Sequence, residues 1–161
     1  MMAVVVYFVA IIASNLSISY FGVWVSPVNS FFLIGLDLSL RDYLHERWQG
    51  EGLWLKMLLL ICGAGFASYL INPASGVIAT ASAVAFVISG LVNTIVYKKL
   101  YKWHFLKKSN ISNTAAAAAD SLIFPAIAFG VWMPVVVLLQ FSAKVGGGFF
   151  WSLVINRIRK I

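Results

Sequence analysis

Apolar side chains make up 61% of the 161 residues of this chain, and charged side chains make up only 11%. A soluble domain carries about 25% charged residues, so the composition excludes a water-exposed domain and favours a compact helical bundle in lipid. The formal net charge of +7 does not indicate a nucleic-acid partner, because the basic residues form short clusters between apolar runs and not one solvated face.

Six apolar segments follow one another along the chain. Each is close to the ~20 residues that a helix needs to cross the hydrocarbon core of a membrane. Pro27, Pro73 and Pro134 lie at or just before the starts of the second, fourth and sixth segments, where a helix does not need the N–H that proline lacks. We therefore predict an all-α integral membrane protein whose one domain, residues 1–161, is a compact bundle of six transmembrane helices. The helices are expected at about residues 2–20, 27–45, 54–72, 75–97, 114–131 and 134–156.

Apart from Arg41 and Lys144, the basic residues all lie at one end of the predicted segments. The turns at 21–26, 72–75 and 131–134 contain no Lys or Arg. The other side carries Arg47, Lys56, Lys98, Lys99, Lys102, Lys107, Lys108, Arg157, Arg159 and Lys160. The positive-inside rule therefore predicts that this side and both termini are cytoplasmic, in a multi-pass protein of the cell inner (cytoplasmic) membrane. The longest connection, about residues 98–113, is expected to lie along the inner membrane surface.

Three ionisable residues lie deep inside predicted helices. Asp37 and Lys144 each follow the proline that begins their helix by ten residues, about 15 Å and close to the bilayer midplane, and Asp120 is about 10 Å deep from the cytoplasmic side. Burying each charge costs about 2.5–3.5 kcal/mol, so each is expected to face the bundle interior and find a partner. A structural ion pair with Lys144 is one interpretation, and a substrate or ion site near the midplane is the favoured one.

Arg41 lies four residues after Asp37 and shares its face of the second helix. We interpret Arg41 either as an inner gate or pairing residue or as an interfacial anchor whose side chain reaches the membrane surface. Asp42 is expected to be an anchor of the second kind.

Neutral polar and small residues surround these charges. Asn15 and Ser89 add hydrogen-bonding groups inside the first and fourth helices. The alanines at 115–119 and the glycines at 146–148 favour close approach of helices. The three glycines could instead loosen the sixth helix and expose backbone groups to a ligand.

No pattern in the sequence points to catalysis, a metal or a cofactor. Cys62 is the one cysteine, which excludes an internal disulfide and a zinc site of several cysteines. The sequence lacks a His–Glu metalloprotease motif, a glycine-rich phosphate loop and a nucleophile beside a plausible base. We therefore expect neither enzymatic activity nor a cofactor.

Three stretches resemble the VUT family of vitamin-uptake or queuosine-precursor transporters. They are residues 82–89 (SAVAFVIS), residues 108–112 (KSNIS) and residues 120–130, where DSLIF is followed after Pro125 by AIAFG. The resemblance covers roughly residues 27–157 and is most specific over 78–130. Gly90 and Lys108 stand where a glutamine and an arginine are expected in that family.

The resemblance implies an importer of 7-cyano-7-deazaguanine or 7-aminomethyl-7-deazaguanine. A carboxylate can accept two hydrogen bonds from the guanine-like edge of such a flat heterocycle, Lys144 or Asn15 can donate to its carbonyl, and an aromatic ring can stack on its face. The expected binding residues are Asp37, Asp120, Lys144, Asn15, Ser89, Ser121 and Phe124, with Arg41 as the gate or pairing residue.

Two other interpretations stay open. The chain could be the substrate-binding subunit of an energy-coupling-factor-type vitamin transporter, with Ala79 and Ala83 as a small-residue face for the coupling partner. It could also be a structural or pore-forming membrane protein without a saturable ligand. Proton coupling through Asp37 or Asp120, passive transport and an ATPase partner are all compatible with the sequence, as is any oligomeric state.

Overall fold

A computed structural model describes residues 2–48 and 52–158, and its backbone there is almost entirely helical. The first span is α1 (Met2–Phe21). The second consists of a 3-10 turn (Val23–Val25), α2 (Ser26–Asn29), a π-helical turn (Ser30–Ile34) and α3 (Gly35–Arg47). The remaining elements are α4 (Leu53–Ile71), a 3-10 turn (Pro73–Ser75) with α5 (Gly76–Lys99), α6 (Phe105–Phe129) and α7 (Pro134–Ile158).

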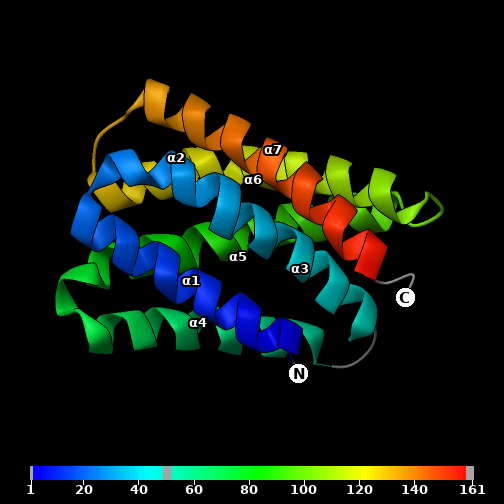
Figure 1. The fold of residues 1–161 in the computed structure, drawn as a ribbon, viewed down its shortest axis with the longest axis horizontal. Coiled ribbons are helices and arrows are strands. Elements are labelled where there is room, and N and C mark those ends of the chain that lie inside the picture. Colours follow the sequence, from blue (N-terminus) through cyan, green and yellow to red (C-terminus); the bar gives the residue numbers. More distant parts are fainter. Residues whose placement is uncertain (1, 49–51, 159–161) are drawn as a thin grey trace.

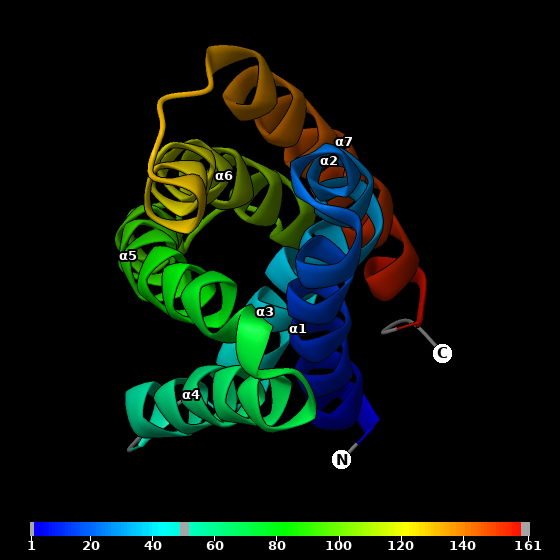
Figure 2. The same cartoon turned by 90° about the vertical axis from the view of Figure 1, so that its left-hand side faces the viewer.

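Six helical spans are long and apolar enough to cross a membrane, and the described residues contain no strand. The predicted all-α fold with six such helices is confirmed at this level. The spans run side by side, and in the view along the bundle α3 lies in the middle of the others (Figures 1 and 2). Burial agrees with this position, because α3 buries eight of its residues: Gly35, Asp37, Leu38, Ser39, Leu40, Arg41, Asp42 and Leu44.

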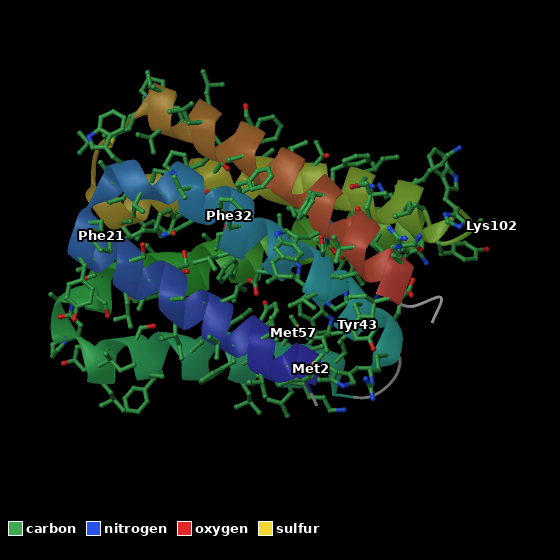
Figure 3. The ribbon with its side chains drawn as sticks, in the orientation of Figure 1. Met2, Phe21, Phe32, Tyr43, Met57 and Lys102 are labelled. Carbon is green, nitrogen blue, oxygen red and sulfur yellow. The ribbon has the colours of Figure 1, made fainter. Side chains whose placement is uncertain are left out.

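The two ends of the bundle differ in charge. Phe21 lies at one end and Lys102 at the opposite end (Figure 3). We call the second one the basic end, because the exposed Lys98, Lys99, Lys102 and Lys107 lie at or next to the α5–α6 connection there. The first residues of α1 and α4 and the last residues of α3 and α7 lie towards the same end (Figure 1). Arg159 and Lys160, which the sequence assigns to the same side, are outside the described residues.

The start of α6 corrects one prediction. This helix begins at Phe105, whereas the sequence predicts a start at 114 and a surface loop before it. Residues 105–113 look like a loop because they are rich in Ser, Asn and Lys, but their Ser and Asn side chains form hydrogen bonds inside the helix or in the core. Asn110 donates to the Leu106 carbonyl at 2.7 Å, and Ser109 is fully buried. Polar side chains therefore extend this helix towards the basic end.

The three glycines of α7 allow two backbones to touch, and they do not break the helix. A Cβ atom on Gly147 would lie 2.1 Å from the carbonyl oxygen of Phe31, and one on Gly35 would lie 2.7 Å from the carbonyl carbon of Gly147. Ser39 also donates to the Gly148 carbonyl at 3.0 Å. Since α7 is helical throughout this stretch, the interpretation of a loosened sixth helix is wrong, and close packing is correct.

Candidate functional site

A buried ion pair joins α6 to α7 inside the bundle. Lys144 Nζ lies 2.6 Å from Asp120 Oδ2, and both residues are at most 5% exposed. The same ammonium donates to Ser121 Oγ at 3.1 Å and to Gln140 Oε1 at 2.9 Å. Three acceptors match the three N–H groups of a lysine, so the cation is fully satisfied without water. The predicted pairing of Lys144 with a deep carboxylate is therefore confirmed, with Asp120 as the partner.

Helix spacing explains how these groups meet. Gln140 precedes Lys144 by one turn of α7, so both side chains leave the same face of that helix. Gln140 Nε2 also donates to Ser26 Oγ, at the start of α2. The cluster thereby ties the second span to the last two helices.

A small cavity lies beside the ion pair, in the half of the bundle away from the basic end. Its volume is about 20 Å³, which accommodates about one water molecule. Its walls combine hydroxyl and amide groups with a few large apolar side chains: Ser14, Ile18, Ser26, Asn29, Ser30, Ile34, Ser82, Phe86, Asp120, Phe124, Gln140 and Lys144. We call it the outer cavity. Both charges and several neutral donors and acceptors thus face one space.

Asp37 and Arg41 lie outside the outer cavity. They are 2% and 3% exposed, so Arg41 does not reach the membrane surface as an anchor. Its Nη1 donates to Ser89 Oγ at 3.4 Å, while its Nε and Nη2 have no hydrogen-bond partner in the part of the chain that the structure describes. Oδ1 of Asp37 and the hydroxyl of Tyr7 have none there either. These groups form a second buried polar layer without complete pairing.

Asp42 belongs to a third polar layer nearer the basic end. It is fully buried and accepts a 2.5 Å hydrogen bond from Ser109, which contradicts its predicted role as an interfacial anchor. Asn113 donates to Ser109 at 3.3 Å, and Asn93 donates to Asn113 at 3.0 Å. Because these residues come from α3, α5 and α6, the network holds three helices together on that side of the bundle.

The structure brings together only part of the binding set predicted from the sequence. Asp120, Lys144 and Ser121 meet in the ion-pair cluster, and Phe124 lines the outer cavity. Asn15 instead donates to Ser68 of α4 at 3.2 Å. Ser89 lies against Arg41, and Asp37 is buried apart from the cavity. The predicted set therefore divides among the ion-pair cluster with its outer cavity, the second polar layer and a separate contact between α1 and α4.

Sequence reasoning did not assign the neutral polar residues of the cavity, above all Gln140, Ser26 and Asn29. The one available signal was Gln140, since it precedes the deep Lys144 by four residues and must share its face. Ser26 and Asn29 flank the proline that begins the second span, and nothing in the sequence distinguishes them there from helix-capping residues.

Ala79, one of the two residues of the predicted small-residue face of α5, packs against α4 within the chain. Ala79 is 5% exposed, and its carbonyl and Cβ lie 3.8 and 3.9 Å from the position of a Cβ atom on Gly65 of α4. This residue therefore serves the packing of α4 against α5.

Comparison of the chain with protein-family models, with curated proteins and with solved structures gave no match.

Proposed function

We propose that the chain is a small importer of the cytoplasmic membrane, of the VUT type, that takes up a 7-deazaguanine precursor of queuosine and is not an enzyme. One observation carries the proposal: a buried Lys144–Asp120 pair faces a polar cavity inside an otherwise apolar bundle. Ionisable groups in the middle of a membrane protein usually belong to the path of a solute. The resemblance of residues 78–130 to the family supplies the substrate class.

The distribution of charge supports an orientation with the basic end and both termini in the cytoplasm. Lys98, Lys99, Lys102 and Lys107 are exposed and lie at or next to the α5–α6 connection, and the exposed Lys56 lies in the first turn of α4. The turns at the opposite end contain no Lys or Arg. Under the positive-inside rule the outer cavity then belongs to the external half of the bundle, where an imported solute arrives first.

The groups in the outer cavity match the edges of a deazaguanine. Asp120 can accept hydrogen bonds from the N–H edge of the heterocycle, Lys144 and Gln140 can donate to its carbonyl, and Phe124 can stack on its face. A cavity of about 20 Å³ is much smaller than a bicyclic base, so the helices must separate for the substrate to enter. Binding would replace the contacts of Lys144 with Ser121 and Gln140 by contacts with the substrate.

The test is calorimetric binding of 7-cyano-7-deazaguanine to the purified protein in detergent, with guanine as the control ligand. The informative variant is Asp120→Asn combined with Lys144→Met, because it removes both charges and leaves neither one unpaired. We expect saturable binding to the wild type and a loss of affinity of about tenfold or more in the double variant, from charge-assisted hydrogen bonds. A matched control is Glu46→Gln with Lys108→Met, which removes the partly exposed 3.0 Å ion pair near the basic end.

Unchanged affinity in the Asp120/Lys144 variant would remove the outer cavity from the proposal. A folded wild type that binds no deazaguanine would favour the structural or pore-forming interpretation. Uptake by proteoliposomes that contain only this chain separates an autonomous importer from a binding subunit that needs ATPase partners. Repeating that uptake with and without an imposed proton gradient tests proton coupling.

A further inference from the structure

A second recess opens between α4 and α5, with α3 as its floor. Its volume is about 390 Å³, many times that of the outer cavity. We call it the inner groove and define it by Arg41, His45, Trp54, Phe86, Gly90 and Leu91. His45 and Trp54 also line a wider opening that reaches Lys98 and Tyr101. The inner groove therefore leads from the middle of the bundle to its basic end.

The inner groove contains a strong hydrogen-bond donor whose capacity is not used. Arg41 lines it, is 3% exposed, and has Nε and Nη2 without partners in residues 2–48 and 52–158. Asp37 and Asp42 attract this guanidinium from a distance, but neither forms an ion pair with it there. A buried guanidinium needs acceptors, and a lipid acyl chain in the groove would supply none. A polar occupant of the groove would supply the missing acceptors.

The space around the guanidinium suits a flat ring. Gly90 leaves one side of Arg41 open, since a Cβ atom at that position would lie 3.6 Å from Nη1. Trp54 is half-exposed in the wall and offers an aromatic face for stacking. The Nε and Nη2 edge of an arginine presents two parallel N–H groups, the arrangement that binds two adjacent acceptors on the edge of a guanine.

We propose that the inner groove is a second binding site for the imported heterocycle on its way to the cytoplasm, with Arg41 as the residue that binds it. The proposal rests on the proposed function and adds a site to it. The carbonyl oxygen and the cyano nitrogen of 7-cyano-7-deazaguanine lie on one edge of the ring system, so both can accept from Arg41. The ligand class is a planar heterocycle with two adjacent acceptors.

Phe86 separates the two sites. Its buried ring lines both the outer cavity and the inner groove. Ser82 on one side of it and Ser89 on the other lie on the same face of α5, because their spacing from Phe86 is four and three residues. A substrate that moves from Lys144 to Arg41 along this face must pass Phe86, which makes that ring the barrier between the sites.

Trp54 provides a direct readout of the inner groove. The experiment measures quenching of tryptophan fluorescence by 7-cyano-7-deazaguanine in the wild type and in Trp54→Phe, and the difference isolates Trp54 from the other tryptophans. Adenine, which has no carbonyl acceptor, is the control ligand. The test variant is Arg41→Gln, and its matched control is Arg47→Gln, the same substitution at a residue of α3 that does not line the groove.

We expect Trp54 quenching in the wild type and in Arg47→Gln, and a loss of apparent affinity of about tenfold or more in Arg41→Gln. Gly90→Val keeps the charge but fills the groove beside the guanidinium, where the ring would lie, so it should also lower the apparent affinity by about tenfold or more, and it tests the proposal if Arg41→Gln does not fold. Quenching with the wild-type apparent affinity in either variant overturns the proposal. Calorimetric binding without any Trp54 quenching also overturns it and leaves the proposed function intact. No calorimetric binding at all removes the proposed function and the inner site together.

Discussion

Lys144 and Asp120 neutralise each other inside the bundle, so the loss of one charge should lower the free energy of unfolding more than the loss of both. Lys144→Met alone would leave a buried carboxylate that has lost its 2.6 Å partner. We expect this variant to lower the free energy of unfolding by about 3–5 kcal/mol, and the combination of Asp120→Asn with Lys144→Met to lower it much less. Denaturant titration in mixed micelles measures both.

Equal destabilisation by the single and the double variant would show that the methylene chain of Lys144, and not its charge, stabilises this region. Ser121→Ala is a useful control, since it removes one acceptor at 3.1 Å and leaves the ion pair in place. Its effect should be limited to about 1 kcal/mol.

The sequence identified the charged residues of the site better than the neutral ones. Asp120 and Lys144 stand out because a charge deep in an apolar segment is rare and needs a partner. Gln140 and Ser26 do not stand out, because neutral polar residues also hold helices together throughout membrane proteins. Asn15 shows the opposite error: the sequence predicts it as a binding residue, but it donates to Ser68 and does not line the cavity. Helical spacing alone cannot say which neighbour a polar face meets.

Two neighbouring glycines of α7, Gly147 and Gly148, are expected to differ in their tolerance of a methyl group. Gly147→Ala would place a Cβ atom 2.1 Å from the Phe31 carbonyl oxygen, a contact between two backbones that cannot relax by a rotamer change. We expect it to destabilise the protein by at least about 3 kcal/mol. The matched control is Gly148→Ala, whose nearest neighbour would be the Cβ of Asn113 at 3.9 Å.

Gly148→Ala should be neutral or stabilising by up to about 1 kcal/mol, because alanine is the better helix former. Thermal unfolding of both variants by circular dichroism in the same detergent gives the comparison. Similar melting temperatures for the two variants would contradict the close contact at Gly147.

The boundaries of helices, like the site residues, can be predicted only where a residue acts on its own neighbourhood in the chain. Proline fixed the starts of the helical spans near Pro73 and Pro134 well, because its missing N–H has a local consequence. The start of α6 could not be predicted in this way. Ser109 and Asn113 look solvated in the sequence, but they bond to each other and to partners on α3 and α5 that lie far away in the chain.

The asymmetry of charge along the bundle predicts its orientation as a whole. In a Cys62→Ala background, Val131→Cys should react with a membrane-impermeant maleimide in intact cells, whereas Lys102→Cys should react only after the cells are permeabilised. Val131 is exposed next to the turn that contains no basic residue, and Lys102 lies at the basic end (Figure 3). The reverse pattern of labelling would invert the orientation and the direction assigned to the two binding sites.

The backbone contact between Gly35 and Gly147 also bears on how such a bundle can move. Two backbones that touch without intervening side chains can pivot against each other, but they can hardly slide. Lys144 lies one turn before this point on α7, and Arg41 lies almost two turns beyond it on α3, towards the basic end. The Gly35–Gly147 contact therefore lies between the two cations, where it can act as a pivot. In an importer built this way, a tilt of α7 against α3 about this contact changes the spacing of the helices around Lys144 and opens the outer cavity, while Gly35 and Gly147 stay in contact.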